Sequence, residues 1–276
     1  MATFHHADVG IVDMFELFNI AERYIELINP TSPDKILTVG KVLGLKKGSR
    51  VIEFGSGYGE VLALWAKAYG ISGVGIDIRE HCCKKAKAKM VRLGFDKDIQ
   101  IVHANGAEYK PDRKDFDVAA CIGASFIWGD FEKTVKALKK TIKPGGKLVV
   151  GEPYWKSDKV PARFRKREPW ARTEPQLLKT IRKAGFELEF MVTSSQDDWD
   201  NYMANNWRGM VAWLKENPKH KDRKQVHSKL RAEQDEYFEF IRKYPQTLAW
   251  LSLGRNVQFV LDGVVYEVVE TAAATP

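Results

Sequence analysis

The sequence predicts an α/β fold with a doubly wound, Rossmann-like sheet of seven mostly parallel strands. Across the centre of the chain, short β-branched runs alternate with segments of helical periodicity, and glycine-rich turns follow several of these runs. Two further helical segments, one N-terminal and one late, lie outside the alternation. Because ligands of open α/β sheets bind beyond the carboxyl ends of the strands, we expect both segments to cover that end.

The first half of the alternation is predicted to supply three strands. A strand over residues 50–54 (RVIEF) ends at the turn GSGYG, and EVLALWAKAYG then places apolar residues on one helical face. A second strand, GVGIDI, ends at Asp77, and REHCCKKAKAKMVRLG predicts a basic amphipathic helix closed by Gly94. The run IQIVHAN predicts the third strand.

The second half is predicted to complete the sheet. FDVAACIG predicts a fourth strand, and a helix follows it in which Phe131, Val135 and Leu138 recur at helical spacing. The turn KPGG then leads to a fifth strand, KLVVGEPYW. PQLLKTIRKAGFELEFMVTSS adds a helix and a strand, and we expect NVQFVLDG near the C-terminus to supply the last strand.

This pattern divides the chain into three parts. Residues 1–44 are expected to form an N-terminal helical lid, with a break at 29–33. Residues 45–194 and 255–265 are expected to form the α/β core, and 195–254 a helical insertion that caps a substrate site. The insertion is rich in aromatic residues at spacings of three and four, which is typical of one buried helix face.

Composition excludes several classes of protein. The 276 residues are 44% hydrophobic and 29% charged, which excludes a disordered or fibrous chain. We expect no membrane span, because no apolar run approaches about 20 residues, and a cytoplasmic location, because the N-terminus lacks a secretory pattern. With three cysteines, two of them adjacent at Cys82 and Cys83, neither a disulfide framework nor a metal site is predicted.

The chain is basic, with 44 Lys and Arg against 36 Asp and Glu and a net charge of +8. Such a charge attracts anions and is compatible with nucleic-acid contact. The basic residues, however, are spread over several separate segments, which favours an ordinary solvated surface. No obligate nucleic-acid partner is therefore expected.

The glycine turn after the first strand is the first sign of chemistry. Gly55, Gly57 and Gly59 let backbone amides approach a ligand at a helix N-terminus. A dinucleotide site prefers G-x-G-x-x-G, whereas this chain has G-x-G-x-G with Glu53 two residues before it. A carboxylate there repels phosphate and suits a ligand with cationic groups. S-adenosylmethionine carries an ammonium and a sulfonium and has no phosphate.

A second acid fits the same nucleoside. Asp77 follows Gly59 by 18 positions at the end of the second strand, where a carboxylate can hold both hydroxyls of a ribose. Together the glycine turn and the two acids predict an S-adenosylmethionine site.

Residues 42–192 resemble the class I S-adenosylmethionine-dependent methyltransferases, and VIEFGSGYGE is similar to the first motif of that family. ACIGASFIWGDF, GEPYW and the late insertion look most like uncharacterised bacterial small-molecule methyltransferases near the ubiquinone and cyclopropane-fatty-acid methyltransferase groups. HANGAEY resembles the motif that reads adenine, with Asn105 where the family usually has an acid; its carbonyl can accept the same hydrogen bond.

The resemblance implies a set of cofactor-binding residues drawn from the ends of the first four strands. In the family the glycine turn meets the methionine part of the cofactor, so Asp77 is expected to hold the ribose and Ile78 to pack on the adenine. The full implied set is Glu53, Gly55, Ser56, Gly57, Gly59, Asp77, Ile78, Asn105, Gly106, Ala107, Cys121, Ile122 and Gly123.

The implied reaction transfers a methyl group in line to a small-molecule acceptor and leaves S-adenosylhomocysteine. The protein then mainly aligns the acceptor and excludes water, and a base is optional. Candidates for removing an acceptor proton are Glu152, Tyr24, Tyr202 or a histidine such as His5 or His6. The expected walls of the substrate pocket are Trp128, Tyr154, Trp155, Trp199 and Trp207, although core packing alone also explains such an aromatic stripe.

Two other functions fit the same motifs. One is an RNA methyltransferase that uses the basic surface, which steep salt dependence of RNA binding would reveal. The other is a protein that binds S-adenosylmethionine and catalyses nothing. The sequence leaves the acceptor atom, the use of a base and the oligomeric state open.

Overall fold

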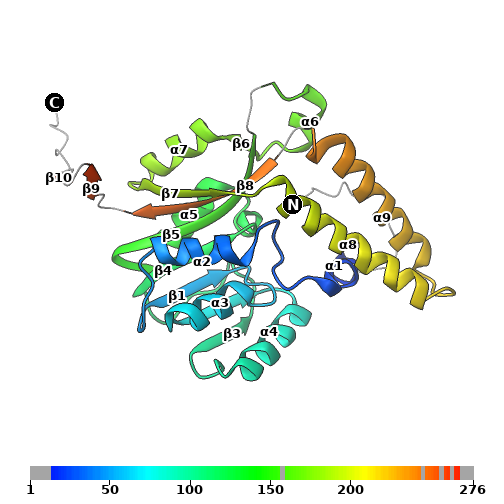
Figure 1. Ribbon diagram of the computed structural model, residues 1–276, viewed down its shortest axis with the longest axis horizontal. Helices are drawn as coiled ribbons and strands as arrows, with labels where there is room; N and C mark the ends of the chain where they lie inside the picture. The colour runs from blue at the N-terminus through cyan, green and yellow to red at the C-terminus, as the bar shows by residue number, and fades with distance from the viewer. Residues whose placement is uncertain (1–13, 156–158, 244–245, 255–257, 262–263, 268–276) are drawn as a thin grey trace.

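The computed structural model describes residues 14–155, 159–243, 246–254, 258–261 and 264–267 (Figure 1). A twisted sheet forms the middle layer, with helices on both faces and a pair of long helices projecting from one end. The predicted α/β fold class is confirmed.

Seven strands follow one another across the sheet in the order β3-β2-β1-β4-β5-β8-β7. They are β1 (Arg50–Phe54), β2 (Ser72–Asp77), β3 (Ile99–His103), β4 (Phe116–Ile122), β5 (Ile142–Trp155), β7 (Glu187–Thr193) and β8 (Gln246–Gly254). The first five are parallel, and β8 runs antiparallel to both of its neighbours. The two-residue β6 (Arg172–Thr173) pairs with the end of β5.

The pleat of the strands divides the core into two faces. Val51 packs with Leu62 and Trp65 in a cluster under α2 (Pro33–Val42), α3 (Glu60–Tyr69) and α4 (Glu80–Leu93). Its neighbour Ile52 packs with Ile181 on the opposite face, under α5 (Phe131–Lys139) and α7 (Glu174–Lys183). Adjacent residues of a strand point to opposite faces of the sheet. β1, β4 and β5 have near-continuous apolar runs because helices cover both faces of these strands.

The predicted turn KPGG is an irregularity inside β5. The register between β4 and β5 shifts from the pair Phe116 and Ile142 to the pair Val118 and Lys147. The intervening residues leave the ladder, and Gly145 among them has φ 74°. A left-handed conformation of this kind is one that glycine adopts without steric cost.

The N-terminal segment and the insertion lie together at the end of the sheet where the strands finish. α1 (Met14–Ala21) and the single-turn η1 (Glu22–Tyr24) contact α8 (Gln196–Glu216), which lies beside α9 (Arg223–Glu236) and its continuation η3 (Tyr237–Ile241) (Figure 1). Gly209 permits this approach, because a Cβ there would collide with the carbonyl oxygens of Ile20 and Ala21.

The remaining short helices are η2 (Ser125–Ile127), after β4, and α6 (Ala162–Arg167), after β5. The predicted break at 29–33 is confirmed: Ser32 caps α2 by accepting a hydrogen bond from the Lys35 backbone, and Pro33 is its first residue.

The prediction for the last strand is wrong. β8 (Gln246–Gly254) lies between β5 and β7, so QTLAWLSLG belongs to the sheet and not to the helical insertion. Residues from NVQFVLDG form β9 (Gln258–Leu261), which pairs with β10 (Val264–Glu267) in a separate two-stranded ladder. A short continuous apolar run fits a buried strand and a buried helix equally well, and that ambiguity caused the error.

Candidate functional site

The glycine turn between β1 and α3 is bound to the end of β2. The backbone N–H groups of Gly55 and Ser56 donate to the Ile76 carbonyl at 2.8 and 3.0 Å, and that of Gly57 donates to Asp77 Oδ2 at 2.8 Å. Gly55 and Gly57 have φ of 72° and 52°, and a Cβ on Gly55 would lie 2.5 Å from Ala124 Cβ. Only glycine fits this close turn, as the sequence predicts.

Asp77 is held in place at the end of β2 by two backbone donors. The Gly57 N–H donates to Oδ2, and the Arg79 N–H donates to Oδ1 at 2.8 Å. The side chain is 8% exposed, and each carboxylate oxygen retains a lone pair for a further donor. This arrangement suits a vicinal diol. Ile78, the residue expected to pack on adenine, is 48% exposed beside it.

The loop after β3 is organised by Asn105. Its Oδ1 accepts from the Ala107 N–H at 3.0 Å, and its Nδ2 donates to Glu108 Oε1 at 2.9 Å. This side-chain turn sets the course of residues 105–107, and the Ala104 N–H anchors the loop to the Asp77 carbonyl at 3.0 Å. The recognition of adenine by Asn105 stays a prediction.

The end of β4 brings its backbone to the site. Cys121 is fully buried in the core under α5, and burial raises the pKa of its thiol, so the side chain serves packing. Gly123 has φ 69° and donates its N–H to the Gly151 carbonyl at 2.9 Å. Ile122 is also buried, and its carbonyl accepts from Asn29 Nδ2 at 3.3 Å.

Glu53 is a buried carboxylate at the end of β1. It is 2% exposed, and burial, reinforced by the charge of Asp77, raises its pKa well above the ordinary range. Among the described residues, no hydrogen-bond partner reaches its Oε2. A buried acid with one unpartnered oxygen beside the glycine turn fits a ligand that carries a positive charge, and S-adenosylmethionine meets this requirement.

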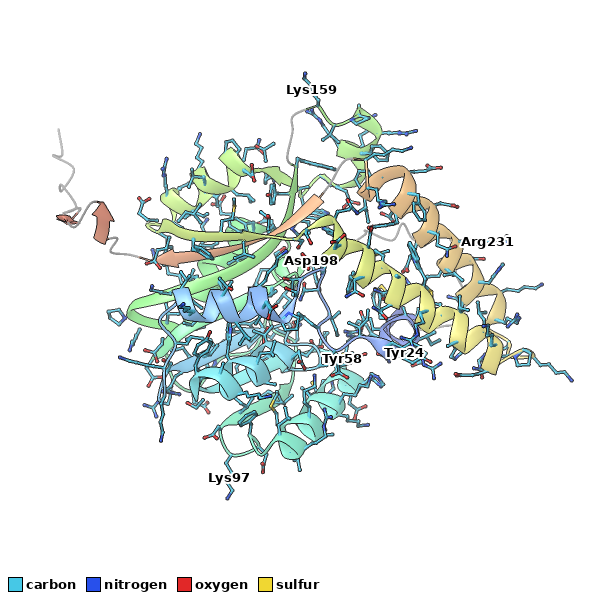
Figure 2. The ribbon with its side chains drawn as sticks, viewed as in Figure 1. Tyr24, Tyr58, Lys97, Lys159, Asp198 and Arg231 are labelled. Atoms are coloured by element: carbon cyan, nitrogen blue, oxygen red, sulfur yellow. The ribbon has the colours of Figure 1, made fainter. Side chains whose placement is uncertain are left out.

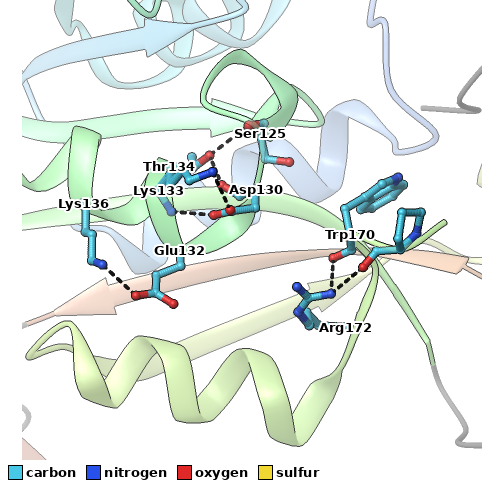
Figure 3. Close-up of polar contacts among 9 residues, drawn as sticks. Ser125, Asp130, Glu132, Lys133, Thr134, Lys136, Trp170 and Arg172 are labelled. Carbon is cyan, nitrogen blue, oxygen red and sulfur yellow. Dashed lines mark hydrogen bonds and ion pairs between the residues drawn. The ribbon is translucent and has the colours of Figure 1, made fainter.

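Glu152 is a second buried carboxylate, near the end of β5. It is 2% exposed, and burial raises its pKa to about 7, although a hydrogen bond with Ser125 opposes the shift. Its Oε2 finds no partner in the described part of the chain. Figure 3 shows how Ser125 is held: Thr134 Oγ1 donates to its carbonyl at 3.2 Å, in the first turn of the helix that Asp130 caps.

In the N-terminal segment that crosses this site, sequence reasoning named Tyr24 but missed the contacts of Glu22, Ile28 and Asn29. We call residues 22–29 the strap. Glu22 forms an ion pair with Arg79 at 2.8 Å, Ile28 packs on the glycine turn, and Asn29 binds the end of β4. No local pattern marks these residues, because their partners lie far away in the sequence.

The two candidate tyrosines lie in different surroundings. Tyr24 is 42% exposed on η1, with the guanidinium groups of Arg23 and Arg208 at 5.4 and 4.4 Å from its ring centroid. Tyr202 is half-buried on α8, where burial, together with the charges of nearby glutamates, raises the pKa of its hydroxyl. Figure 2 labels Tyr24 on η1 and Tyr58 on the glycine turn, on the side of the molecule from which α8 projects.

The predicted pocket aromatics separate into three places. Trp128 is half-buried at the site end, 5.1 Å from the Phe54 ring. Tyr154 is buried in the core beneath α7. The other three, Trp155, Trp199 and Trp207, belong to one cluster in which the end of β5 and the α6 region pack against the insertion. In the described structure the indole N–H groups of Trp199 and Trp207 are buried without a hydrogen-bond acceptor.

His5 and His6 lie outside the described residues. Within the described ranges, no three His, Cys, Asp or Glu side chains gather closely enough to hold a metal ion. In the same part of the chain, no helix has both the length and the apolar character needed to cross a membrane.

The fold and the site define a nucleoside-binding α/β protein of the methyltransferase class. Residues 51–146 match the family model described as "Methyltransferase domain". The chain is 33% identical over 239 residues to the uncharacterized protein YjhP of Escherichia coli strain K12, covering 84% of this chain and 95% of the relative. The chain belongs to the class I S-adenosylmethionine-dependent methyltransferase family.

Two further similarities agree with this assignment. A methyltransferase structure from Thiobacillus denitrificans, solved with S-adenosylhomocysteine, is 34% identical with a TM-score of 0.79, covering 88% of this chain and 99% of that one. The ubiquinone/menaquinone biosynthesis C-methyltransferase UbiE of Cronobacter sakazakii is 30% identical over 114 residues, 40% of this chain and 44% of the relative. The resemblance predicted from the motifs is confirmed.

Proposed function

We propose that this methyltransferase acts on a small-molecule acceptor and that Glu152 accepts a proton from it. The observation that carries the proposal is the buried Glu152 carboxyl, whose pKa of about 7 lets it exchange a proton near neutral pH. When bound, S-adenosylmethionine supplies a methyl group on a sulfonium leaving group. The residues of the chain then bind the cofactor, orient the acceptor and exclude water.

Three strand ends, those of β1, β2 and β3, support the placement of the cofactor. We assign the ammonium to the neighbourhood of Glu53, the ribose hydroxyls to Asp77 and the adenine to the surface between Ile78 and Asn105. Glu53 is buried without a partner for one oxygen in the described residues, and Asp77 is already oriented by two backbone donors. Preoriented carboxylates of this kind need no rearrangement to receive donors from a ligand.

The position of Glu152 supports a role toward the acceptor. β5 is one strand beyond β4 in the sheet, and the Gly123 N–H is bonded to the Gly151 carbonyl directly before Glu152. The carboxylate therefore lies beside the end of β4, where the resemblance implies the cofactor-binding residues Cys121, Ile122 and Gly123. A hydroxyl or ammonium acceptor would lose its proton to a carboxylate oxygen of Glu152.

The covering elements favour a small acceptor over RNA. η1, α1 and α8 pack against one another at the end of the sheet, and aromatic side chains from α8 and η3 fill the interior of the insertion. A covered apolar site excludes water from the reaction and admits small molecules more readily than a polymer.

Methyl-tritiated S-adenosylmethionine tests the class of acceptor. The purified protein would be incubated in parallel with a low-molecular-mass cell extract and with total RNA, and the label followed by chromatography. We expect label in the small-molecule fraction. Label in RNA would favour the RNA methyltransferase, whereas cofactor binding with no labelled product from either pool would favour a non-catalytic binding protein.

Substitution tests Glu152 once an acceptor fraction is found. Glu152→Gln is expected to lower the turnover number by about 100-fold, in the range typical for loss of a general base, while the affinity for S-adenosylhomocysteine stays unchanged. Glu132→Gln, which removes an exposed ion pair with Lys136 on α5, serves as the matched control. Turnover by Glu152→Gln equal to that of the control would remove Glu152 from the mechanism.

A further inference from the structure

One ion pair joins the strap to the residue that holds Asp77. Arg79 caps the N-terminus of α4, and its backbone N–H donates to Asp77 Oδ1 at 2.8 Å. Its guanidinium donates to Glu22 Oε2, also at 2.8 Å, with the two side chains only 12% and 6% exposed. Arg79 therefore contacts the proposed ribose carboxylate with its backbone and the strap with its side chain.

The rest of the strap follows the same strand ends. Glu26 pairs with Lys89 of α4 at 2.7 Å, and Lys89, itself 6% exposed, also pairs with Glu60 at the start of α3. Asn29 Nδ2 donates to the Ile122 carbonyl at the end of β4. The strap thus spans the ends of β2, β1 and β4.

The glycine turn lies directly against the strap. A Cβ on Gly57 would lie 2.9 Å from Ile28 Cδ1, so the backbone that we assign to the methionine part of the cofactor is covered by a strap side chain. The covering helices meet at the same ion pair, since the Phe18 ring of α1 lies 5.9 Å from the Arg79 guanidinium and 5.0 Å from Lys229 Nζ of α9.

We propose that Glu22 and Arg79 are positioning residues that couple the orientation of Asp77 to closure of the strap. With the ion pair formed, the strap holds the cofactor against the glycine turn, and S-adenosylmethionine or its product leaves only after the pair opens. The inference goes beyond the methyl transfer itself and rests on the cofactor placement given under Proposed function.

The burial of the pair gives this coupling its strength. An ion pair in water contributes little, but loss of one partner from a buried pair leaves the other charge unpaired in a medium that solvates it poorly. The closed strap is therefore favoured as long as both charges are present. Removal of either charge favours the open strap.

The test measures the association and dissociation rate constants of S-adenosylhomocysteine by stopped-flow tryptophan fluorescence. The variants are Glu22→Gln, Arg79→Met, the double variant and Arg79→Lys. Glu80→Gln is the control, because it removes an exposed ion pair with Lys84 from the same helix. Thermal unfolding of each variant establishes that it is folded, and Glu22→Met, which also removes the charge, replaces Glu22→Gln if the latter is not.

We expect Glu22→Gln and Arg79→Met each to release S-adenosylhomocysteine at least about tenfold faster, with association unchanged or faster. The double variant should release no faster than the faster single variant, because both changes break the same contact. Arg79→Lys, which keeps the charge, should restore most of the slow release. If the ion pair had a purely structural role, its loss would instead slow association, and Arg79→Lys would not restore slow release.

Two results would overturn the inference, and they are distinguishable. If Asp77→Ala weakens binding while the ion-pair variants release S-adenosylhomocysteine like Glu80→Gln, or if the double variant shows additive effects, the cofactor site stands and the coupling is wrong. If Asp77→Ala binds S-adenosylhomocysteine like the unmodified protein, the cofactor placement is wrong and the coupling falls with it.

Discussion

At the scale of single residues, the site end of the sheet holds polar atoms that burial has separated from water. In the described residues, Glu53 Oε2, Ser56 Oγ, Tyr58 Oη and Glu152 Oε2 are all buried without a hydrogen-bond partner. Each such atom costs folding free energy of about 1–3 kcal/mol. They cluster at the ends of β1 and β5, which is typical of a binding site whose polar groups wait for a ligand at a cost in folding stability.

The ribose carboxylate gives the most direct prediction at this scale. Asp77→Ala is expected to weaken S-adenosylhomocysteine binding by about 1–3 kcal/mol, since it removes hydrogen bonds to a charged group. Isothermal titration calorimetry measures the change. Asp96→Ala, on the exposed loop before β3, is the control and should bind normally; equal affinity in the two variants would contradict the assignment.

The pKa of Glu152 predicts how stability depends on pH. Because burial raises this pKa to about 7 from its ordinary value of 4.5, the protonated form is favoured in the folded protein. The stability that this preference contributes is complete below the unfolded pKa and is lost as the pH rises through 7. Glu152→Gln, which does not titrate, should therefore become the more stable form at high pH.

The size of this effect follows from the shift. Between pH 4.5 and pH 8 the variant should gain up to about 3 kcal/mol in unfolding free energy relative to the unmodified protein. Urea unfolding at pH 5 and pH 8 measures the gain. A difference that stays constant between the two pH values would show that Glu152 keeps an ordinary pKa.

At the scale of elements, close packing of α8 on α1 and η1 determines where the insertion lies. The contact is centred on Gly209, which faces the carbonyl oxygens of Ile20 and Ala21. Met210, Leu214 and Leu230 close the apolar cluster around it. A helix that crosses another at a glycine can approach the backbone itself, so Gly209 sets how closely the insertion lies against α1 and η1.

Gly209→Ala is expected to separate α8 from α1 and to lower the unfolding free energy by about 1–3 kcal/mol, as overpacking does. The gain in helix propensity offsets only part of this loss. Thermal unfolding measures the effect. Val211→Ala, at a 37% exposed position on the same helix, should change stability little, and a Gly209→Ala protein as stable as that control would show that the helices can separate freely.

At the scale of the whole molecule, ion pairs connect the covering helices to the α/β core. Lys35 of α2 pairs with Asp198 near the start of α8, and Glu22 pairs with Arg79. Within the covering elements, Arg23 of η1 pairs with Glu216 at the far end of α8 at 2.7 Å. Binding at the strand ends should therefore stabilise the chain as one cooperative unit.

Ligand binding should appear as a shift of the whole unfolding transition. At 100 times its dissociation constant, S-adenosylhomocysteine should stabilise the protein by about 2.7 kcal/mol, and differential scanning fluorimetry should record a higher melting temperature in a single transition. A short RNA duplex at physiological salt should leave the transition in place. A transition that splits on ligand addition would show that the covering helices unfold separately from the core.

Local patterns in the sequence determined most of the fold and the cofactor motifs. Five parallel strands and the glycine turn follow from β-branched runs, helical periodicity and residues that tolerate a left-handed backbone, all of which act within about ten residues. Glu53 and Asp77 were found in the same way, because Asp77 ends its strand and Glu53 is one residue from the end of its strand. Where the local pattern was ambiguous, at residues 246–254, the prediction failed.

Tertiary structure alone decided the properties that depend on burial and on distant partners. The Glu22 and Arg79 ion pair joins residues 57 positions apart, and Asn29 binds a carbonyl 93 positions away. The raised pKa of Glu152 comes from desolvation, which exists only after the sheet and helices have packed. A sequence displays which residues can ionise or pair; only packing decides which of them lose water and which partners they meet.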